Sequence, residues 1–222
     1  MRCIREAVGA FVSRGWEFEL IVCDNNSSDR TAELARAEGA VVVFEPVNQI
    51  ARARNAGAAV ATGDWLLFVD ADSFPNRALF AGVAEQIQIG RCLGGGATIQ
   101  LDESRPLLNV LTGGWNLLSR ATKWVAGSFI FCEAAAFRQI GGFSIEFFAG
   151  EELDLSKRLK TLARAQKRTM VILRCHPLLT SARKARLYSV RELGRVLLRA
   201  AFMPRRLMRN RAECAMWYDG RR

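Results

Sequence analysis

The stretch Leu66-Leu67-Phe68-Val69-Asp70-Ala71-Asp72 ends an apolar run in two carboxylates that are one residue apart. The apolar run favours a buried strand. Alternate side chains of a strand share a face, so Asp70 and Asp72 would lie on the same side if the extended backbone continued. Two like charges held together repel each other unless a cation lies between them. The aspartates therefore either flank a solvated turn or hold a metal ion.

Around this stretch, short apolar and partly β-branched runs alternate with helical patterns. The predicted strands are residues 18–23, 40–44, 65–69, 97–101, 128–132 and 169–173. The predicted helices are residues 29–38, 49–61, 76–89 and 151–165. This alternation predicts an α/β layered fold with a central, mostly parallel sheet. Ligands of such sheets bind beyond the carboxyl ends of the strands, where CDNNSSD (23–29) and DADS (70–73) both lie.

Length, hydropathy and cysteine usage narrow the class of protein. A chain of 222 residues can form one sizeable core. No apolar run approaches the roughly 18–20 residues that cross a bilayer, and the first residues lack the apolar segment of a secretory signal. The six cysteines are scattered without a C-x-x-C pair, which indicates buried thiols in a reducing compartment rather than a metal-thiolate site. We therefore expect a cytoplasmic protein.

The positive charge is concentrated at the C-terminal end. Residues 183–222 contain twelve Arg or Lys and three acids, which gives +9 of the chain's net +10. We expect a main domain over 1–182 and a basic helical tail over 183–222, whose apolar face carries Leu187, Val190, Leu193, Val196 and Leu197. The arginines either form a solvated face packed on the body or hold the protein peripherally at an anionic membrane surface.

Two further segments carry candidate chemistry. In ELIVCDNNSSDRT (19–31), Asp24 follows a predicted strand and could accept hydrogen bonds from a nucleotide base. The predicted helix that starts nearby would favour a phosphate group. The other interpretation is an Asx-type loop and helix cap without a ligand. In GGFSIEFFAGEELDLSKRLK (141–160), acids gather at a predicted helix start. Asp154 and Arg158 are spaced as a helical ion pair. Glu152, among acidic neighbours, could have a raised proton affinity and act as a base.

Asp70 and Asp72 also suit a hard divalent cation, which proteins commonly bind through one or two carboxylates and the phosphates of a substrate. The order and spacing of four segments then point to a family. IVCDNNSSDRT (21–31), ARARNAGAAVATGDWLLFVDADS (51–73), GSFIFCEAAAFRQIGGF (127–143) and GEELDLSKRL (150–159) together resemble the family 2 glycosyltransferases of the GT-A fold, which is Rossmann-like. The resemblance runs from about residue 19 to residue 183.

The resemblance implies an inverting transfer from a nucleotide-sugar donor, and it implies a role for each matched residue. The nucleotide-sugar site would comprise Asp24, which reads the base, with Asn26, Arg54, Asn55, Asp70 and Ala71. Asp72 would ligate Mn²⁺ or Mg²⁺ on the diphosphate, and Glu152 would be the general base. His176 falls where some members have a late metal or phosphate contact, although a histidine before a proline also suits a structural role.

The sequence departs from the family pattern in three places. The usual first strand with its Pro-x-Tyr/Phe-Asn-Glu loop is absent, Asn25-Asn26 replaces the commoner Asp-Gly, and the base is Glu instead of Asp. We expect a metal-dependent transferase that moves a sugar, from a UDP-sugar in preference, to a saccharide or lipid-linked acceptor hydroxyl in cell-envelope polysaccharide or glycolipid biosynthesis. The alternatives are transfer to a polyprenyl phosphate and a non-catalytic module whose basic tail binds nucleic acid or acidic lipid.

Overall fold

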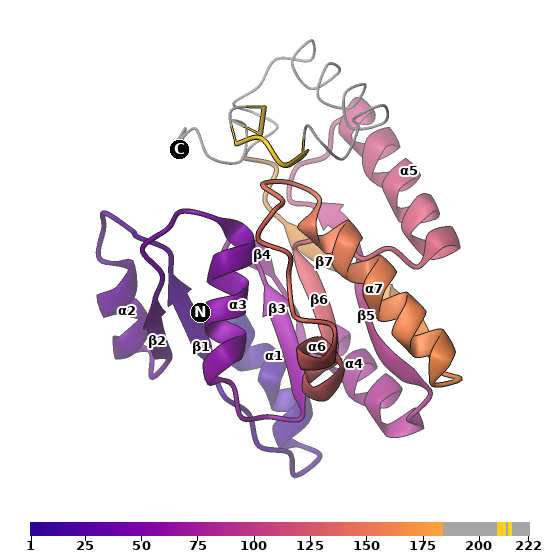
Figure 1. Ribbon diagram of the computed structural model, residues 1–222, viewed down its shortest axis with the longest axis horizontal. Coiled ribbons are helices and arrows are strands. Elements are labelled where there is room, and N and C mark those ends of the chain that lie inside the picture. The colour runs from indigo at the N-terminus through magenta and orange to yellow at the C-terminus, as the bar shows by residue number, and fades with distance from the viewer. Residues whose placement is uncertain (184–207, 212, 215–222) are drawn as a thin grey trace.

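The computed structural model describes residues 1–183, 208–211 and 213–214. Its strands form two sheets (Figure 1). One is the parallel pair β1 (Ile21–Asp24) and β2 (Val41–Phe44). The other has the order β3-β6-β5-β7-β4 and comprises β3 (Trp65–Val69), β4 (Ser73–Phe74), β5 (Cys92–Leu101), β6 (Phe129–Glu133) and β7 (Thr169–Thr180).

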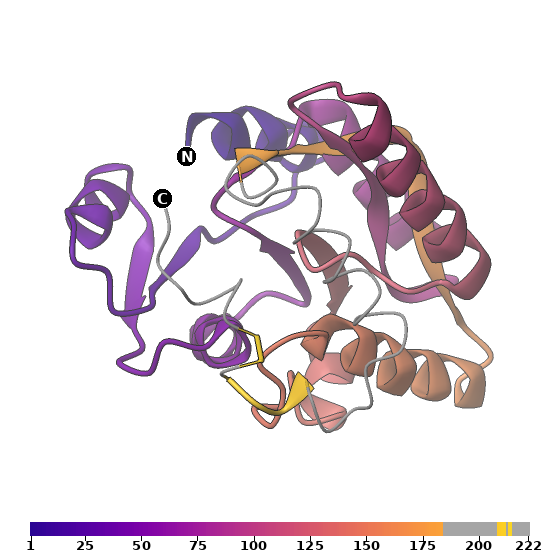
Figure 2. The same ribbon diagram turned by 90° about the horizontal axis from the view of Figure 1, so that it is seen from above.

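Helices cover both faces of the five-stranded sheet (Figure 2). The helices of the described residues are α1 (Arg2–Val12), α2 (Thr31–Ala37), α3 (Ile50–Val60), α4 (Arg77–Ile89), α5 (Pro106–Thr122), α6 (Ala134–Gln139) and α7 (Glu151–Ala165), of which α2 packs on the parallel pair β1 and β2 instead. Strand β6 shows how the two cores divide, because Ile130 and Cys132 pack with α3, α6 and α7. Phe129 and Phe131 point the other way and pack with α1 and α4. The sheet thus separates two apolar layers.

The main sheet is mixed, which corrects the expectation of a mostly parallel one. Only β5 and β7 pair in parallel within it, whereas β3–β6, β5–β6 and β4–β7 are antiparallel. The prediction assumed that each helix carries the chain back to start a parallel neighbour. Helix α5 and the loop after it instead return the chain to the end of the sheet where β3 finishes, since Asp70 donates its main-chain N–H to Ser128 O at 3.2 Å. Strand β6 therefore runs back against both neighbours.

The glycines before the predicted strand 97–101 belong to that strand. Residues Gly94, Gly95 and Gly96 lie in the middle of the sheet between β6 and β7. A Cβ on Gly94 would lie 2.5 Å from Phe131 O, and one on Gly95 would lie 2.1 Å from Val171 O. Only glycine permits this close approach of three backbones.

The other predicted elements are found with boundary shifts of a few residues, and the predicted helix 151–165 coincides with α7. Strand β7 is longer than expected and contains an irregularity. Leu173 pairs with Ala97 and Leu178 with Ile99, so residues 174–177 lie opposite Thr98 alone. This bulge carries His176, which is exposed.

The predicted basic tail lies mostly outside the described residues. Of it, Arg183 is described, as are 208–211 and 213–214. Met208 accepts a hydrogen bond from Phe148 N at 2.8 Å, and Arg209 pairs with Glu146 at 2.8 Å. This short part of the tail packs on the loop that precedes α7. Within the described residues, no helix is both long and apolar enough to cross a membrane.

Candidate active site

Arg54 on α3 joins the end of β3 to the start of α7. From Nη2 it donates to Asp70 Oδ1 and to the main-chain oxygen of Gly127, both at 2.8 Å, and from Nη1 it donates to Glu151 Oε1 at 2.8 Å. Only 11% of its side chain is exposed. Burial alone would lower the pKa of this guanidinium, but the charges of Asp70 and Glu151 outweigh burial and raise it. Arg54 is therefore a permanent buried cation that gathers carboxylates from two elements.

Glu151 and Glu152 begin α7, where the helix dipole favours negative charge. The Glu151 side chain is 5% exposed and its charge is compensated by Arg54. Glu152 is partly buried. Burial first, and then the charge of Glu151, raises the pKa of Glu152 to about 8, although Arg54 opposes this. One acid of this pair is thus paired with a cation, while the other has the proton affinity of a group that exchanges protons near neutral pH.

Gly127 closes the site from the side of β6. A Cβ at this position would lie 3.3 Å from Arg54 Nη2 and 3.5 Å from Glu152 Cδ. The absence of a side chain lets Arg54 reach the Gly127 carbonyl and leaves room beside the Glu152 carboxyl group. The role of Gly127 was not predicted from the sequence, nor was that of Glu151 as the partner of Arg54, because a contact between residues 97 positions apart has no local signal.

Asp70 and Asp72 belong to a turn and not to a continued strand. Ser73 N donates to Asp70 O at 3.0 Å, which reverses the chain directly after β3. The Asp70 side chain remains 41% exposed despite its bond to Arg54. Asp72 is partly exposed, and no hydrogen bond to its carboxylate is found within the described residues. Both aspartates thus remain partly exposed to solvent, and Ala71 between them is exposed.

These two carboxylates fit a Mg²⁺ or Mn²⁺ ion only in part. Oxygen donors of this kind suit either ion. However, no group of three or more His, Cys, Asp or Glu side chains within the described residues is placed to hold a metal by itself. The donor set therefore matches an ion whose remaining ligands come from a bound molecule such as a diphosphate.

Asp24 ends β1 and is 8% exposed. Its Oδ1 accepts the main-chain N–H of Ser27 at 2.9 Å, so the predicted Asx-type loop is present. Asn26 is exposed and has a positive φ of 59°. Its neighbour Asn25 donates to Glu45 O and Val47 O and accepts from Gln49 N, which connects this loop to the start of α3.

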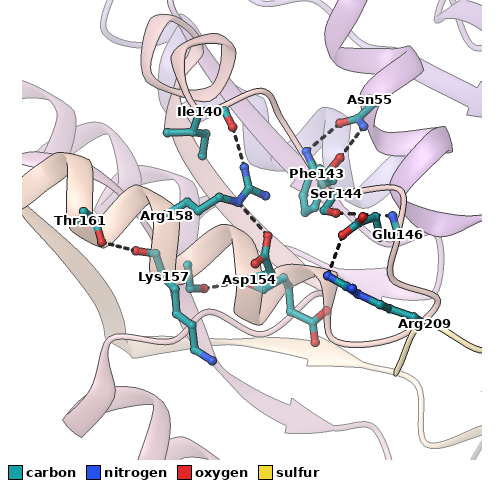
Figure 3. A network of polar contacts seen from close by, with 12 residues as sticks. Asn55, Ile140, Phe143, Ser144, Glu146, Asp154, Lys157, Arg158, Thr161 and Arg209 are labelled. Atoms are coloured by element: carbon teal, nitrogen blue, oxygen red, sulfur yellow. Dashed lines mark hydrogen bonds and ion pairs between the residues drawn. The ribbon is translucent and has the colours of Figure 1, made fainter. Parts of the chain in front are cut away.

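Asn55 holds the loop that precedes α7. Its Nδ2 donates to Phe143 O at 2.8 Å, and its Oδ1 accepts from Phe143 N at 2.9 Å (Figure 3). Buried Gln49 holds the same loop through its Nε2, which donates to Ile145 O and Phe147 O. The amide of Asn55 is thus used within the protein, and its expected contact with a nucleotide would compete with these bonds.

A cavity of about 630 Å³ lies beside this loop and is lined by Asn55, Asp154 and Arg158 among others. Asp154 and Arg158 form the predicted helical ion pair at 2.7 Å (Figure 3). His176 instead lines a second cavity of about 550 Å³ with Arg14 and Glu85. Within the described residues, no hydrogen bond or ion pair joins His176 to the turn that carries Asp70 and Asp72. The structure gathers Arg54, Asp70, Glu151 and Glu152 in one place.

Comparison with protein families gives one match. The family model described as "Glycosyl transferase family 2" matches residues 2–139, which is more than half of the chain. Among curated proteins, a TPR repeat-containing protein of Synechococcus elongatus is 46% identical over 55 residues, which are 24% of this chain and 14% of that protein.

Solved structures share the fold at low sequence identity. S. aureus TarS 1–349 has a TM-score of 0.60 and 16% identity over 82% of this chain and 57% of that chain. The same fragment in complex with UDP has a TM-score of 0.59 and 17% identity, and the match covers 80% of this chain and 56% of that chain. Mannosyltransferase PcManGT from Pyrobaculum calidifontis, in complex with GDP-Man and Mn²⁺, has a TM-score of 0.56 and 20% identity. This match covers 80% of this chain and 52% of that chain. The chain spans little more than half of the length of these proteins.

Proposed function

The chain belongs to glycosyl transferase family 2, and from this premise we propose that it transfers a sugar from a nucleotide diphosphate donor to an acceptor hydroxyl. We propose an inverting transfer from a UDP-sugar. In support of a nucleotide-sugar donor, solved structures of the same fold include complexes with UDP, UDP-GlcNAc and GDP-Man. The proposed acceptor is a cell-envelope polysaccharide or glycolipid.

The observation that carries this proposal is the carboxylate cluster around Arg54. Asp70 comes from the end of β3, Glu151 from the start of α7, and both bond to one buried guanidinium. Glu152 lies beside them with a raised pKa. In sheets of this class, ligands bind at the end where the strands finish. The family match itself ends at residue 139, so the roles proposed for α7 depend on this geometry and on the sequence motif.

In the proposed donor complex, Asp24 accepts hydrogen bonds from the base, while Asn26 and Ala71 lie along the nucleotide. Asp72, with Asp70, would hold Mn²⁺ or Mg²⁺ together with the donor's phosphates. When bound, the ion supplies positive charge that stabilises the departing nucleoside diphosphate. Arg54 keeps Asp70 and Glu151 in place and offsets part of their mutual repulsion.

Glu152 is the proposed general base. In this role its carboxylate takes the proton of the acceptor hydroxyl as the hydroxyl oxygen attacks the anomeric carbon from the face opposite the leaving group. The raised pKa makes Glu152 a stronger proton acceptor than an ordinary carboxylate. Its neighbour Glu151, held by Arg54, supplies part of this effect. A single carboxylate is sufficient here, whereas glycosidases use two that flank the bond.

The variant Glu152→Gln tests this role. We expect it to abolish sugar transfer while the dissociation constant of the donor changes by less than about threefold, because the amide preserves shape but accepts no proton. Release of nucleoside diphosphate and calorimetric donor titration measure the two quantities. Glu33→Gln, at an exposed acid on α2, is the control and should change neither.

Full transfer by Glu152→Gln would contradict the assignment of the base. That result would favour a polyprenyl phosphate acceptor, which is already anionic and needs no base. Absence of binding to any nucleotide sugar, together with salt-sensitive binding to RNA, would favour the non-catalytic module.

The proposed domain division places the transferase in residues 1–182 and a basic appendage in 183–222. The cytoplasm is the proposed compartment. In support of it, the six cysteines are free thiols, and Cys92, Cys132 and Cys214 are buried.

A further inference from the structure

Helix α5 has an apolar face that points away from the protein. Val110 is 71% exposed, Leu117 66%, Leu107 45% and Leu118 43%. These residues recur at helical spacing, so they form one stripe along the helix, which we call the α5 stripe. The opposite side of α5 is attached to the fold through buried Leu108 and Ser119, while Asn116 exchanges two hydrogen bonds with the main chain of Ile99.

An outward apolar face reverses the pattern of an ordinary surface helix, whose exposed side is polar. Isolated exposed leucines need no explanation, but a contiguous stripe indicates a surface that contacts something apolar. The only charged side chain within α5 is Arg120. Helix α5 lies at the periphery of the molecule in both views (Figures 1 and 2).

Cations gather at the C-terminal end of the α5 stripe. Arg120 is exposed, and Lys123 follows the helix directly. From α7, Lys160 Nζ donates to Thr122 O at 2.5 Å, and Lys157 lies 5.3 Å from the centre of the Trp124 ring. No acid occurs between residues 104 and 123. One end of the apolar surface is therefore positively charged.

The last residues before the strongly basic C-terminal segment lie near the other end of α5. Ala182 N donates to Asp102 Oδ1 at 2.7 Å, and Asp102 N donates to Thr180 O at 3.0 Å. Asp102 lies four residues before the start of α5 at Pro106, so residue 183, the first of the segment 183–222 with its net charge of +9, lies near that end of the helix. A partner that suits both features has an apolar interior and an anionic surface.

We propose that the α5 stripe, with the cations at its end, is a membrane-contact surface that binds anionic lipid bilayers. Leucine and valine side chains enter the boundary between headgroups and acyl chains, while lysines and arginines remain at the level of the anionic headgroups. Each cation near such a surface adds to the attraction, which salt screens. This surface is separate from the Arg54 cluster, so the proposal does not depend on the proposed reaction.

Vesicle flotation of the full chain tests this proposal. We expect binding to phosphatidylcholine vesicles that contain phosphatidylglycerol and much weaker binding to phosphatidylcholine alone. The double variant Val110→Ser with Leu117→Ser should reduce the partition coefficient about tenfold or more, because it removes the two most exposed apolar side chains of the stripe. The matched control is Val12→Ser with Ile89→Ser, two side chains with exposures of 55% and 53% on other helices, and it should bind as the wild type does.

Three results would overturn the proposal. The first is a wild-type chain that floats with neither kind of vesicle. The second is binding that Val110→Ser with Leu117→Ser leaves unchanged, which would assign all of the attraction to the basic segment. The third is concentration-dependent self-association, without vesicle binding, that the same double variant abolishes; it would make the α5 stripe an interface between copies of this chain. Circular dichroism of each variant confirms that it is folded.

Discussion

Replacement of Arg54 by methionine removes the cation that compensates Glu151 and Asp70. The Arg54–Glu151 pair is nearly buried on both sides, with side-chain exposures of 11% and 5%. Removal of one partner from such a pair leaves an uncompensated buried charge and costs about 3–5 kcal/mol. The Asp70 side chain is 41% exposed, so its bond adds at most about 1 kcal/mol. We therefore expect Arg54→Met to lower the free energy of unfolding by about 4 kcal/mol.

Urea unfolding at neutral pH measures this loss, which corresponds to a decrease of roughly 8–16 °C in melting temperature for a chain of this size. The double variant Arg54→Met with Glu151→Gln should recover about 2 kcal/mol relative to the sum of the single changes, because it leaves no buried charge unpaired. Asp70→Asn alone should cost less than about 1 kcal/mol. A loss below about 1 kcal/mol in Arg54→Met, or additive effects of the two changes, would refute the reasoning.

Two further predictions concern Glu152 and the glycines of β5. The pKa of Glu152 is raised from 4.5 to about 8 in the folded protein, so the wild type loses stability as pH rises through this range. Glu152→Gln should therefore be more stable than the wild type above pH 8, by at most about 5 kcal/mol, and should show no such gain below pH 4.5. Urea titrations measure this difference, and equal pH profiles of the two proteins would contradict it. Gly95→Ala should cost more than about 3 kcal/mol or prevent folding, because its Cβ would meet Val171 O at 2.1 Å. Gly113→Ala in α5, with open space around the new methyl group, should stabilise by about 0.5–1 kcal/mol; thermal melts of similar midpoint for the two alanine variants would argue against the packing described for β5.

Local patterns were sufficient to predict the elements that hold the site. The apolar run that ends at Val69 and the amphipathic pattern of residues 151–165 correspond to β3 and α7. The resemblance to family 2 glycosyltransferases is confirmed by the family model, which matches residues 2–139. These features depend on neighbours within a few residues, where periodicity and propensity carry the information.

Features that depend on distant neighbours were missed. Glycine usually interrupts a strand, yet Gly94 and Gly95 lie in the centre of the sheet because β6 and β7 approach too closely for a side chain. The nucleotide contacts expected of Arg54 and Asn55 stay predictions. The internal bonds of Arg54 to Asp70 and Glu151, and of Asn55 to the main chain of Phe143, were not predicted. The partners in these bonds lie up to 97 residues apart, and no local pattern encodes such pairs.

The direct test of the account is calorimetric titration of a UDP-sugar with and without Mn²⁺, on the wild type and on Asp72→Asn. We predict that Mn²⁺ strengthens donor binding to the wild type by at least about tenfold, because Asp72 and the donor's phosphates would together supply ligands to the ion. The same addition should change binding to Asp72→Asn by less than about threefold. If Mn²⁺ left the donor affinity of the wild type unchanged, or changed it equally in both proteins, the result would contradict the claim that the turn after β3 is a metal-dependent donor site.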